Sequence, residues 1–539
     1  MNSSPLLTLS GFGVSFRSEY GSISAVRDLN AVIGKGEWVA VVGESGSGKS
    51  VTALSILRLL PSSAEYSGKL LLHEGNKEIS LTEIPESEIN EVRGKKISMI
   101  FQEPMSSLNP VIRCGGQIAE TLRRHRNMND AEARKEAISL LNQVKLPDPE
   151  NIFHRYPHEL SGGQKQRVMI AIAISCNPSL LICDEPTTAL DPDVSQSILM
   201  LLRELQVSRR MSILFITHDL GILESVADRI LVLYRGNLIE SAPTESIYKN
   251  PKHPYTRALL ACRPGLYPPG TRLPVVEDFL SGSLTKVPDA TPGQQPNTGN
   301  EKRKPVFLDI RNLTVTHSRN GLLGSGGNTV AVDKANFSIY RGETLGLTGP
   351  SGSGKTTLGR AILNLIPAAP GSEVRYGDVN LAALSRSEWK PFRKKFQLIF
   401  QDPYSSLNPS MTAGQLIAEP MEVHGLGGSH AERQEMVRTL LESVQLPADA
   451  VNRYPREFSG GQRQRIGIAR ALALKPEFLV CDESVSALDV SVQAQILNLL
   501  NELKSRFSLT LLFISHNHEV VRYFCDRIIR IENGRVFPG

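Results

Sequence analysis

Two stretches of the chain change in the same way from a buried-strand pattern to an amphipathic-helix pattern. The apolar run WVAVVG begins at Trp38, and a glycine-rich loop and a segment with apolar residues three and four apart follow it up to Pro61. The run TLGLTG, from Thr344, opens the same succession, which ends at Pro367. Continuous apolar runs indicate strands buried on both faces, and the later spacing is that of an amphipathic helix. The chain is therefore predicted to be α/β, with a strand–loop–helix unit at two places.

Five motifs occur twice, in the same order and about 300 residues apart. The pairs are GESGSGKS and GPSGSGKT, FQEPMSSLNP and FQDPYSSLNP, LSGGQ and FSGGQ, LLICDEPTTALD and FLVCDESVSALD, and LFITHD and LFISHN. A nearly constant separation means that one structural unit is used twice. We predict domains at residues 5–250 and 306–537. Residues 251–305 between them begin with the helix-patterned NPKHPYTRALLACRP region and continue with a Gly/Pro-rich composition that is typical of a linker.

Composition narrows the class of protein. The 539 residues carry a formal net charge of +5, which is too small for a dedicated nucleic-acid binder, so we expect no nucleic-acid partner. No apolar run approaches the roughly 20 residues that span a bilayer, and the amino end does not resemble a secretion signal, so a cytosolic location is expected. The six cysteines include no CxxC pair, which argues against a zinc site, an iron–sulfur cluster or a disulfide framework.

The two glycine-rich loops, residues 43–50 and 349–356, fit the pattern GxxxxGK(S/T) in the strand–loop–helix context that this pattern requires. Glycines let backbone N–H groups converge on phosphate oxygens, and the start of the following helix favours negative charge. The lysines are then predicted to contact the β- and γ-phosphates and the hydroxyls to bind Mg²⁺: Lys49 with Ser50, and Lys355 with Thr356.

A pair of carboxylates follows a buried strand in each copy. Asp184 and Asp482 are placed to hold Mg²⁺, and Glu185 and Glu483 to orient and polarise an attacking water. On its own, an Asp-Glu pair after a strand is more often a solvated turn. The phosphate loops upstream favour the catalytic interpretation.

Two turns with the sequence SGGQ, residues 161–164 and 459–462, put two glycines at the start of a predicted helix. We call them the signature turns. Together with the other motifs they make the chain similar to the nucleotide-binding subunits of ABC transporters. This resemblance implies two tandem P-loop NTPase domains of the ABC type, each with a RecA-like core and a helical subdomain. It also implies that two cassettes pack head to tail, with each ATP between the phosphate loop of one and the signature turn of the other.

The resemblance implies two composite ATP sites. The first comprises Tyr20, Gly43, Glu44, Ser45, Gly46, Ser47, Gly48, Lys49, Ser50, Val51, Gln102, Asp184, Glu185 and His218 with Ser459, Gly460, Gly461 and Gln462. The second comprises Gly349, Pro350, Ser351, Gly352, Ser353, Gly354, Lys355, Thr356, Thr357, Gln401, Asp482, Glu483 and His516 with Ser161, Gly162, Gly163 and Gln164.

Individual roles also come from the resemblance. The glutamates, the histidines and the loop lysines are the catalytic residues, and Gln102 and Gln401 touch Mg²⁺ and transmit the nucleotide state to a membrane partner. Tyr20 stacks on adenine, whereas the second copy offers no aromatic there except His317. Both copies are expected to hydrolyse ATP.

The FQ(E/D)P segments and the HPYT stretch resemble the oligopeptide/dipeptide/nickel branch of bacterial importers, and in particular its fused two-cassette members. That branch implies two transmembrane permease subunits, an extracytoplasmic solute-binding protein and a peripheral position on the cytoplasmic face of the inner membrane. Residues 105–126 and 404–422 are the expected docking surface. Relatives often carry a cysteine cluster after HPYT, but only Cys262 is present here, so no iron–sulfur cluster is expected.

The alternative function is a soluble twin-cassette ATPase acting on the ribosome, which typically has a long, charged helical connector instead of a Gly/Pro linker. DNA-repair cassettes would need long coiled-coil insertions, for which the spacing leaves no room. The solute stays open among peptides, nickel, glutathione and related compounds, because selectivity in such systems lies in other chains.

Overall fold

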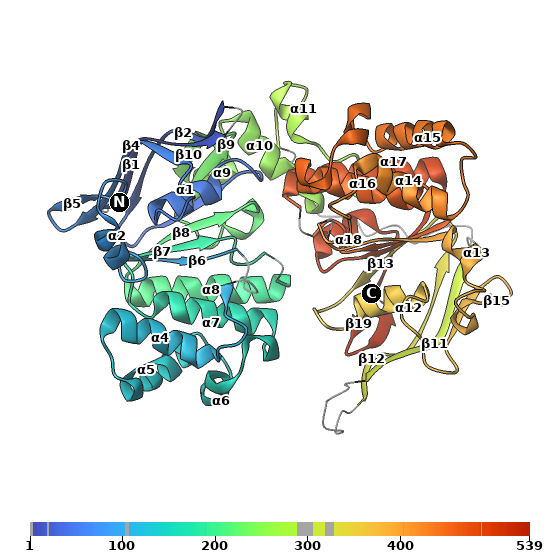
Figure 1. Ribbon diagram of the computed structural model, residues 1–539, viewed down its shortest axis with the longest axis horizontal. Coiled ribbons are helices and arrows are strands. Elements are labelled where there is room, and N and C mark those ends of the chain that lie inside the picture. Colours follow the sequence, from blue (N-terminus) through green and yellow to red (C-terminus); the bar gives the residue numbers. More distant parts are fainter. Residues whose placement is uncertain are drawn as a thin grey trace. The chain divides into compact units, whose positions relative to one another are not determined.

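The computed structural model describes residues 4–18, 21–102, 107–188, 190–287, 305–318, 328–402, 404–486 and 488–538 (Figure 1). The chain divides into two compact units, Met1–Leu260 with Val276–Val287 and Ala261–Val275 with Pro288–Gly539. We call them the first and the second cassette. The residues predicted to link the domains are thus shared between the two units.

The first cassette contains two sheets with helices around them. Its strands are β1 (Pro5–Ser18), β2 (Gly21–Gly34), β3 (Trp38–Val42), β4 (Ala64–Glu74), β5 (Lys77–Ser80), β6 (Ile97–Ile100), β7 (Leu180–Asp184), β8 (Ser212–Thr217), β9 (Arg229–Tyr234) and β10 (Asn237–Pro243). Its helices are α1 (Lys49–Ile56), α2 (Glu86–Val92), α4 (Cys114–Arg126), α5 (Asp130–Gln143), α6 (Pro149–His154), α7 (Gly162–Ile174), α8 (Pro192–Arg209), α9 (Thr244–Lys249), α10 (Pro254–Ala261) and α11 (Val276–Leu280).

The second cassette repeats this plan. Its strands are β11 (Val306–Ser318), β12 (Asn328–Tyr340), β13 (Thr344–Thr348), β14 (Glu373–Tyr376), β15 (Val379–Asn380), β16 (Phe396–Ile399), β17 (Phe478–Asp482), β18 (Thr510–Ile514), β19 (Arg527–Glu532) and β20 (Arg535–Pro538). Its helices are α12 (Lys355–Ile362), α13 (Lys390–Arg393), α14 (Ala413–Val423), α15 (His430–Ser443), α16 (Gly460–Leu472), α17 (Val490–Phe507) and α18 (His518–Phe524).

Each cassette combines an antiparallel sheet with a mainly parallel one. In the first, the orders are β2-β1-β4-β5 and β10-β9-β3-β8-β7-β6, and only β10 runs antiparallel in the larger sheet. Leu7 and Leu70 of the small sheet, Val39 of the large sheet and Ile56 of α1 are fully buried in one cluster. The helix α1 is therefore held between two apolar sheet faces, which fixes the position of the loop in front of it (Figure 1).

The first helix of each cassette ends earlier than the prolines Pro61 and Pro367 suggested. Helix α1 ends at Ile56 because Arg58 takes a left-handed backbone with φ 50°, and the Leu59 N–H turns back to the Leu54 carbonyl. Asn364, also at φ 50°, ends α12 in the same way. A left-handed residue satisfies the last carbonyls of a helix without a proline, and the apolar spacing beyond it does not reveal this.

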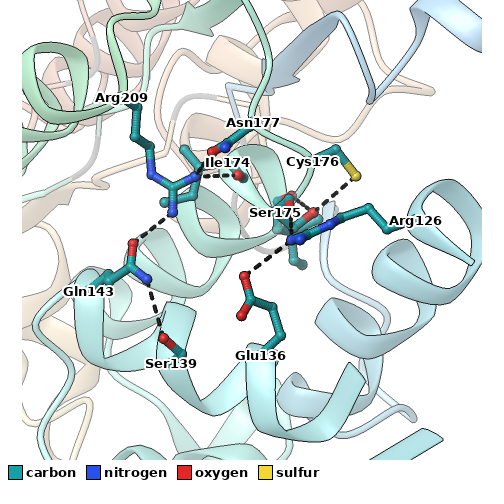
Figure 2. A network of polar contacts seen from close by, with 10 residues as sticks. Arg126, Glu136, Ser139, Gln143, Ile174, Ser175, Cys176, Asn177 and Arg209 are labelled. Carbon is teal, nitrogen blue, oxygen red and sulfur yellow. Dashed lines mark hydrogen bonds and ion pairs between the residues drawn. The ribbon is translucent and has the colours of Figure 1, made fainter. Parts of the chain in front are cut away.

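Helices α4, α5 and α6 form a group next to α7, which connects them to the parallel sheet (Figure 1). The last carbonyls of α7 are capped by two arginines: Arg126 donates to Ser175 O at 3.4 Å and Arg209 to Ile174 O at 3.0 Å (Figure 2). Arg209 also donates to Gln143 Oε1 at 2.7 Å, and Arg126 pairs with Glu136 at 3.1 Å. Cations favour the C-terminus of a helix, so this network joins the helical subdomain to α8 of the core.

A pair of neighbouring glycines tests the packing of the helical subdomain. A Cβ at Gly115 would lie 2.0 Å from the Phe153 ring, whereas a Cβ at Gly116 would meet no atom closer than 3.6 Å. We expect Gly115→Ala to destabilise the subdomain by about 1–3 kcal/mol through overpacking. Gly116→Ala should be neutral or stabilise by up to about 1 kcal/mol, because alanine favours helix. Urea unfolding with a probe in α4 measures both, and equal stabilities would contradict this packing.

Candidate functional site

The predicted phosphate loops connect β3 to α1 and β13 to α12. Lys49 Nζ donates to the carbonyl oxygens of Gly43 at 2.7 Å and Glu44 at 2.9 Å, so its charge lies inside the curve of the loop. Lys355 makes the same two bonds in the second loop, at 2.8 and 2.9 Å. The first N–H groups of a helix have no partner within the helix and attract anions. Each loop is therefore suited to bind an anion. Its lysine can exchange the two carbonyl oxygens for the oxygens of a phosphate.

Glycine is required at the entrance of each loop. Gly43 has φ 154°, and a Cβ there would stand 2.2 Å from the carbonyl oxygen of Leu233 on β9. Gly349, at φ 151°, faces the carbonyl of Ile531 at the same 2.2 Å. A residue with a Cβ would not fit so close to the neighbouring strand.

Each loop also buries one unpaired hydroxyl. Ser47 Oγ and Ser353 Oγ have no hydrogen-bond partner among the described residues, and these serines are only 3% and 7% exposed. Buried polar groups are normally paired, because an unpaired one costs about 1–3 kcal/mol. A hydroxyl donor aimed at a phosphate oxygen would be satisfied, so both loops fit a phosphate-bearing ligand.

The hydroxyl at the start of the first helix meets a carboxylate at the end of a strand. Ser50 Oγ donates to Asp184 Oδ1 at 3.1 Å, and burial raises the pKa of Asp184 to about 6 despite that hydrogen bond. Thr356 Oγ1 donates to Asp482 Oδ1 at 2.9 Å, and burial likewise raises the pKa of Asp482. A hydroxyl oxygen beside a carboxylate is a donor set that suits Mg²⁺. A cation there would offset the cost of burying the charged carboxylates.

Glu185 follows Asp184 and gathers three polar side chains. Gln102 Nε2 and Thr188 Oγ1 donate to its Oε2 at 3.1 and 3.0 Å, and His218 Nδ1 lies 3.3 Å from the same oxygen. Burial acts to raise the pKa of Glu185, but the hydrogen bond and charge of His218, with the charge of Lys49, lower it below its usual value. The carboxylate is therefore ionised at neutral pH and able to accept a proton.

Glu483 has a related set of neighbours in the second cassette. Gln401 Nε2 donates to Glu483 Oε2 at 2.7 Å, and His516 Nδ1 lies 3.4 Å from Oε1. Ser486 stands where Thr188 stands in the first cassette, but its hydroxyl donates to the Glu483 backbone carbonyl at 2.8 Å. The two carboxylates therefore differ by one hydrogen bond.

The signature turns begin α7 and α16. Ser161 caps α7 by accepting from the Gln164 N–H, and the Gln164 side chain returns to the Ser161 N–H. Ser459 and Gln462 form the same capping box on α16. The second glycine of each turn packs on a neighbouring helix: a Cβ at Gly163 would lie 2.7 Å from Val194, and Gly461 has the equivalent contact at 2.3 Å.

The remaining predicted residues fall into two groups. Some lie in the described loops and turns beside those above, namely Ser45, Gly46, Gly48, Val51, Ser351, Gly352, Gly354, Thr357, Gly162 and Gly460. Tyr20, predicted to stack on adenine, lies outside the described residues, as does the side chain of His317. The adenine contact therefore stays a prediction.

Two contacts were missed by the motif analysis. Thr188 lies inside the motif LLICDEPTTALD, but nothing in the sequence distinguishes its role from that of its neighbour Thr187. Tyr255, from the HPYT stretch, accepts a hydrogen bond from the Glu44 N–H of the first phosphate loop at 2.9 Å. The HPYT motif marked the tyrosine but not its partner 211 positions away.

Comparisons with known proteins identify the family. Residues 26–188 and 332–486 match the family described as ABC transporter, and residues 239–288 match the oligopeptide/dipeptide transporter, C-terminal region. The chain is 44% identical over 542 residues to the glutathione import ATP-binding protein GsiA of Salmonella paratyphi A, covering 99% of this chain and 86% of that protein. It is 45% identical over 545 residues to GsiA of Escherichia coli K12, covering 98% and 85%.

Among solved structures, a dimeric bacterial ABC transporter cassette is 28% identical, with a TM-score of 0.40, and the match covers 44% of this chain and 99% of that one. Within the described residues, no helix is both long enough and apolar enough to cross a bilayer. The family match covers both phosphate loops and both carboxylate pairs. The chain therefore belongs to the ABC transporter family, as an ATP-hydrolysing protein with two cassettes in one polypeptide.

Proposed function

We propose that this chain powers the uptake of peptides or related small solutes by a membrane ABC importer. The match of residues 239–288 to the oligopeptide/dipeptide transporter region carries the proposal. Further support is the 44% identity to a protein named for glutathione import, because glutathione is itself a small peptide. Nickel and other solutes remain alternatives, since the solute is selected by other chains of such a system.

The proposed assembly places this chain as a peripheral subunit on the cytoplasmic face of the inner membrane. It would join two transmembrane permease subunits and an extracytoplasmic solute-binding protein. Its two ATP sites would be composite, with the phosphate loop of each cassette completed by the signature turn of the other. Support for this pairing is that each signature turn begins a helix, because the first N–H groups of a helix have no partner within it and attract anions.

Hydrolysis at the first site would use the side chains at the ends of the parallel strands. Ser50, Asp184 and Gln102 would hold Mg²⁺, which supplies charge neutralisation on the phosphates. Glu185 would orient the attacking water and accept its proton, and His218, beside it, would contact the γ-phosphate. Lys49 would leave its two carbonyl oxygens for the phosphates. The second site would use Thr356, Asp482, Gln401, Glu483, His516 and Lys355 in the same roles.

A groove in the second cassette supports docking of a permease. The groove encloses about 390 Å³ and runs between α14, β16 and α16. Its rim exposes apolar side chains, with Phe400 at 44% and Val423 at 76%, and Arg470 and Glu419 form an ion pair of 3.1 Å at its side. Exposed apolar side chains around a concave site are typical of a surface that a partner covers. Phe400 precedes Gln401, so a segment in the groove would lie next to the residue expected to sense the nucleotide.

The alternative, action on the ribosome, has less support from the connection between the cassettes. Over residues 251–287 of that connection, the helices are the eight-residue α10, the short 3-10 turn η3 (Pro264–Leu266) and the five-residue α11. A long charged helical connector of the ribosomal kind has no counterpart in this described segment. Co-purification with membranes rather than with ribosomes would decide between the two functions.

The catalytic assignment predicts the effect of removing each carboxylate charge. We expect Glu185→Gln and Glu483→Gln each to remove half or more of ATP turnover, and the double variant to lower it about 100-fold or more, because the general base contributes roughly 10²–10⁴-fold. Phosphate release by the assembled importer measures this. Glu88→Gln, a change of an exposed carboxylate on α2 outside the sites, is the control. Unchanged turnover in both single variants would contradict the assignment.

If a permease docks in this groove, a charge at its rim should weaken assembly and leave nucleotide binding unchanged. Val423→Asp should weaken co-purification with the permeases about tenfold, since a charge replaces an apolar contact at the rim of the groove. Val207→Asp, at a similarly exposed valine (68%) on α8, is the matched control and should have no effect. ATP binding by the isolated chain should stay the same in both variants. Equal co-purification of the two variants would contradict a permease in this groove.

A further inference from the structure

The HPYT stretch forms the start of α10 and is fixed to β10. The N–H groups of Lys252 and His253 donate to the two carboxylate oxygens of Glu240, at 2.8 and 3.0 Å. The His253 ring nitrogen Nδ1 accepts the Tyr255 N–H at 3.1 Å, and Pro254 occupies the first helical position, where no N–H is needed. Three of the four residues of the motif, His253, Pro254 and Tyr255, thus set the start of one short helix and hold it against the sheet.

The tyrosine of the motif points from this helix into the first phosphate loop. Its side chain is fully buried, and its ring lies 4.3 Å from the ring of Tyr234 at the end of β9. Its hydroxyl oxygen accepts the N–H of Glu44 at 2.9 Å. A buried phenol with both its ring and its oxygen engaged has little freedom, so the Glu44 peptide is held by a fixed partner.

The peptide unit that carries the Glu44 N–H also carries the Gly43 carbonyl, which accepts from Lys49 Nζ at 2.7 Å. The Glu44 carbonyl accepts from Lys49 Nζ at 2.9 Å and from the Ser47 N–H at 3.1 Å. When Lys49 turns to a phosphate, as the proposed function requires, both carbonyls lose their bond to it. Tyr255 would still hold the N–H of the Gly43–Glu44 peptide.

The phosphate loop of the second cassette is held in a different way. The residue that corresponds to Glu44 is Pro350, which has no N–H to donate. Its carbonyl is bound as in the first loop, by Lys355 Nζ at 2.9 Å and by the Ser353 N–H at 3.2 Å. The proline ring itself restricts φ to about −65°. One loop is thus stiffened by its own ring, and the other by a tyrosine from outside the loop.

We infer that Tyr255 is a positioning residue for the first ATP site, through which the HPYT stretch sets the nucleotide affinity of the first cassette and not of the second. The inference rests on the proposed function, in which residues 43–50 bind the phosphates of ATP. Tyr255 does not touch the nucleotide in this role. It acts by keeping the Glu44 peptide in the orientation that the phosphates meet, which reduces the ordering cost of binding.

The test measures each loop separately in the full-length chain. Lys355→Ala leaves the first loop to bind the fluorescent nucleotide mant-ATP with Mg²⁺, and Lys49→Ala leaves the second. Tyr255→Phe keeps the buried ring and removes the oxygen. We expect it to raise the Kd of mant-ATP about 3- to 10-fold in the Lys355→Ala chain, the value of one hydrogen bond, and to leave the Kd in the Lys49→Ala chain unchanged.

Two further variants separate positioning from general packing. Tyr523→Phe removes another buried hydroxyl, which donates to the Thr271 carbonyl at 2.5 Å in the second cassette, and should leave the Kd of the first loop unchanged. Glu44→Pro gives the first loop the residue of the second and removes the N–H. In that background Tyr255→Phe should have no further effect on the Kd, a non-additivity that a purely structural role would not produce.

The outcomes are distinct. An unchanged Kd for Tyr255→Phe in the Lys355→Ala chain, or equal weakening in both single-loop chains, would overturn the role of Tyr255. Additive effects of Glu44→Pro and Tyr255→Phe would overturn it as well. If the chain with Tyr255 intact binds mant-ATP through neither loop, the proposed function itself fails, and the role of Tyr255 fails with it.

Discussion

The parallel register of the large sheet is the constraint on which both candidate sites depend. Strand β3 pairs with β8, and β8 pairs with β7, so their carboxyl ends lie at one edge. That edge receives the phosphate loop after β3, the carboxylates Asp184 and Glu185 at the end of β7, and His218 after β8. Asp184 stands opposite Ile216 in the ladder, and a slip of one residue would turn the carboxylates to the other face. The positions of these side chains are therefore set by the pairing of the strands.

The same pairing supports a strained residue at each site. Glu185 and Glu483 have φ 48° and 45°, a left-handed backbone that costs a non-glycine residue roughly 1–2 kcal/mol. Each is held there by an N–H that donates to the neighbouring strand, to Ile216 O and Ile514 O at 3.0 Å. The strain occurs at the same position of both copies. It is therefore a property of the fold at the point where the chain leaves the strand. This tight turn lets the glutamate follow the aspartate directly and still face the histidine that comes after the neighbouring strand.

Sequence patterns predicted the elements of the sites better than the contacts between them. The apolar runs located β3, β7 and their copies, and the glycine spacing located the loops, because both depend on local backbone requirements. The predicted end of α1 lay several residues beyond the observed one, because the spacing of apolar residues does not reveal the left-handed backbone of Arg58. The bond between Tyr255 and Glu44 was not predictable, because it joins residues that only the three-dimensional packing of α10 on the sheet brings together. The protonation of Asp184 depends on burial, which a sequence motif does not record.

One helix in each cassette connects the turn that carries Glu185 or Glu483 with the signature turn. Helix α8 begins a few residues after Glu185, with Asp191 at its N-terminal cap, and its first turn carries Val194, against which Gly163 packs. A Cβ at Gly163 would lie 2.7 Å from that valine, so the two helices have no space in which to shift independently. In the proposed composite arrangement, Glu185 serves one ATP and Ser161 the other. A displacement of α8 caused by either ATP would then reach the other site through this contact, and α17 with Gly461 would do the same in the second cassette. If the ATP sites are composite as proposed, they would respond to each other through the packing of α8 and α17.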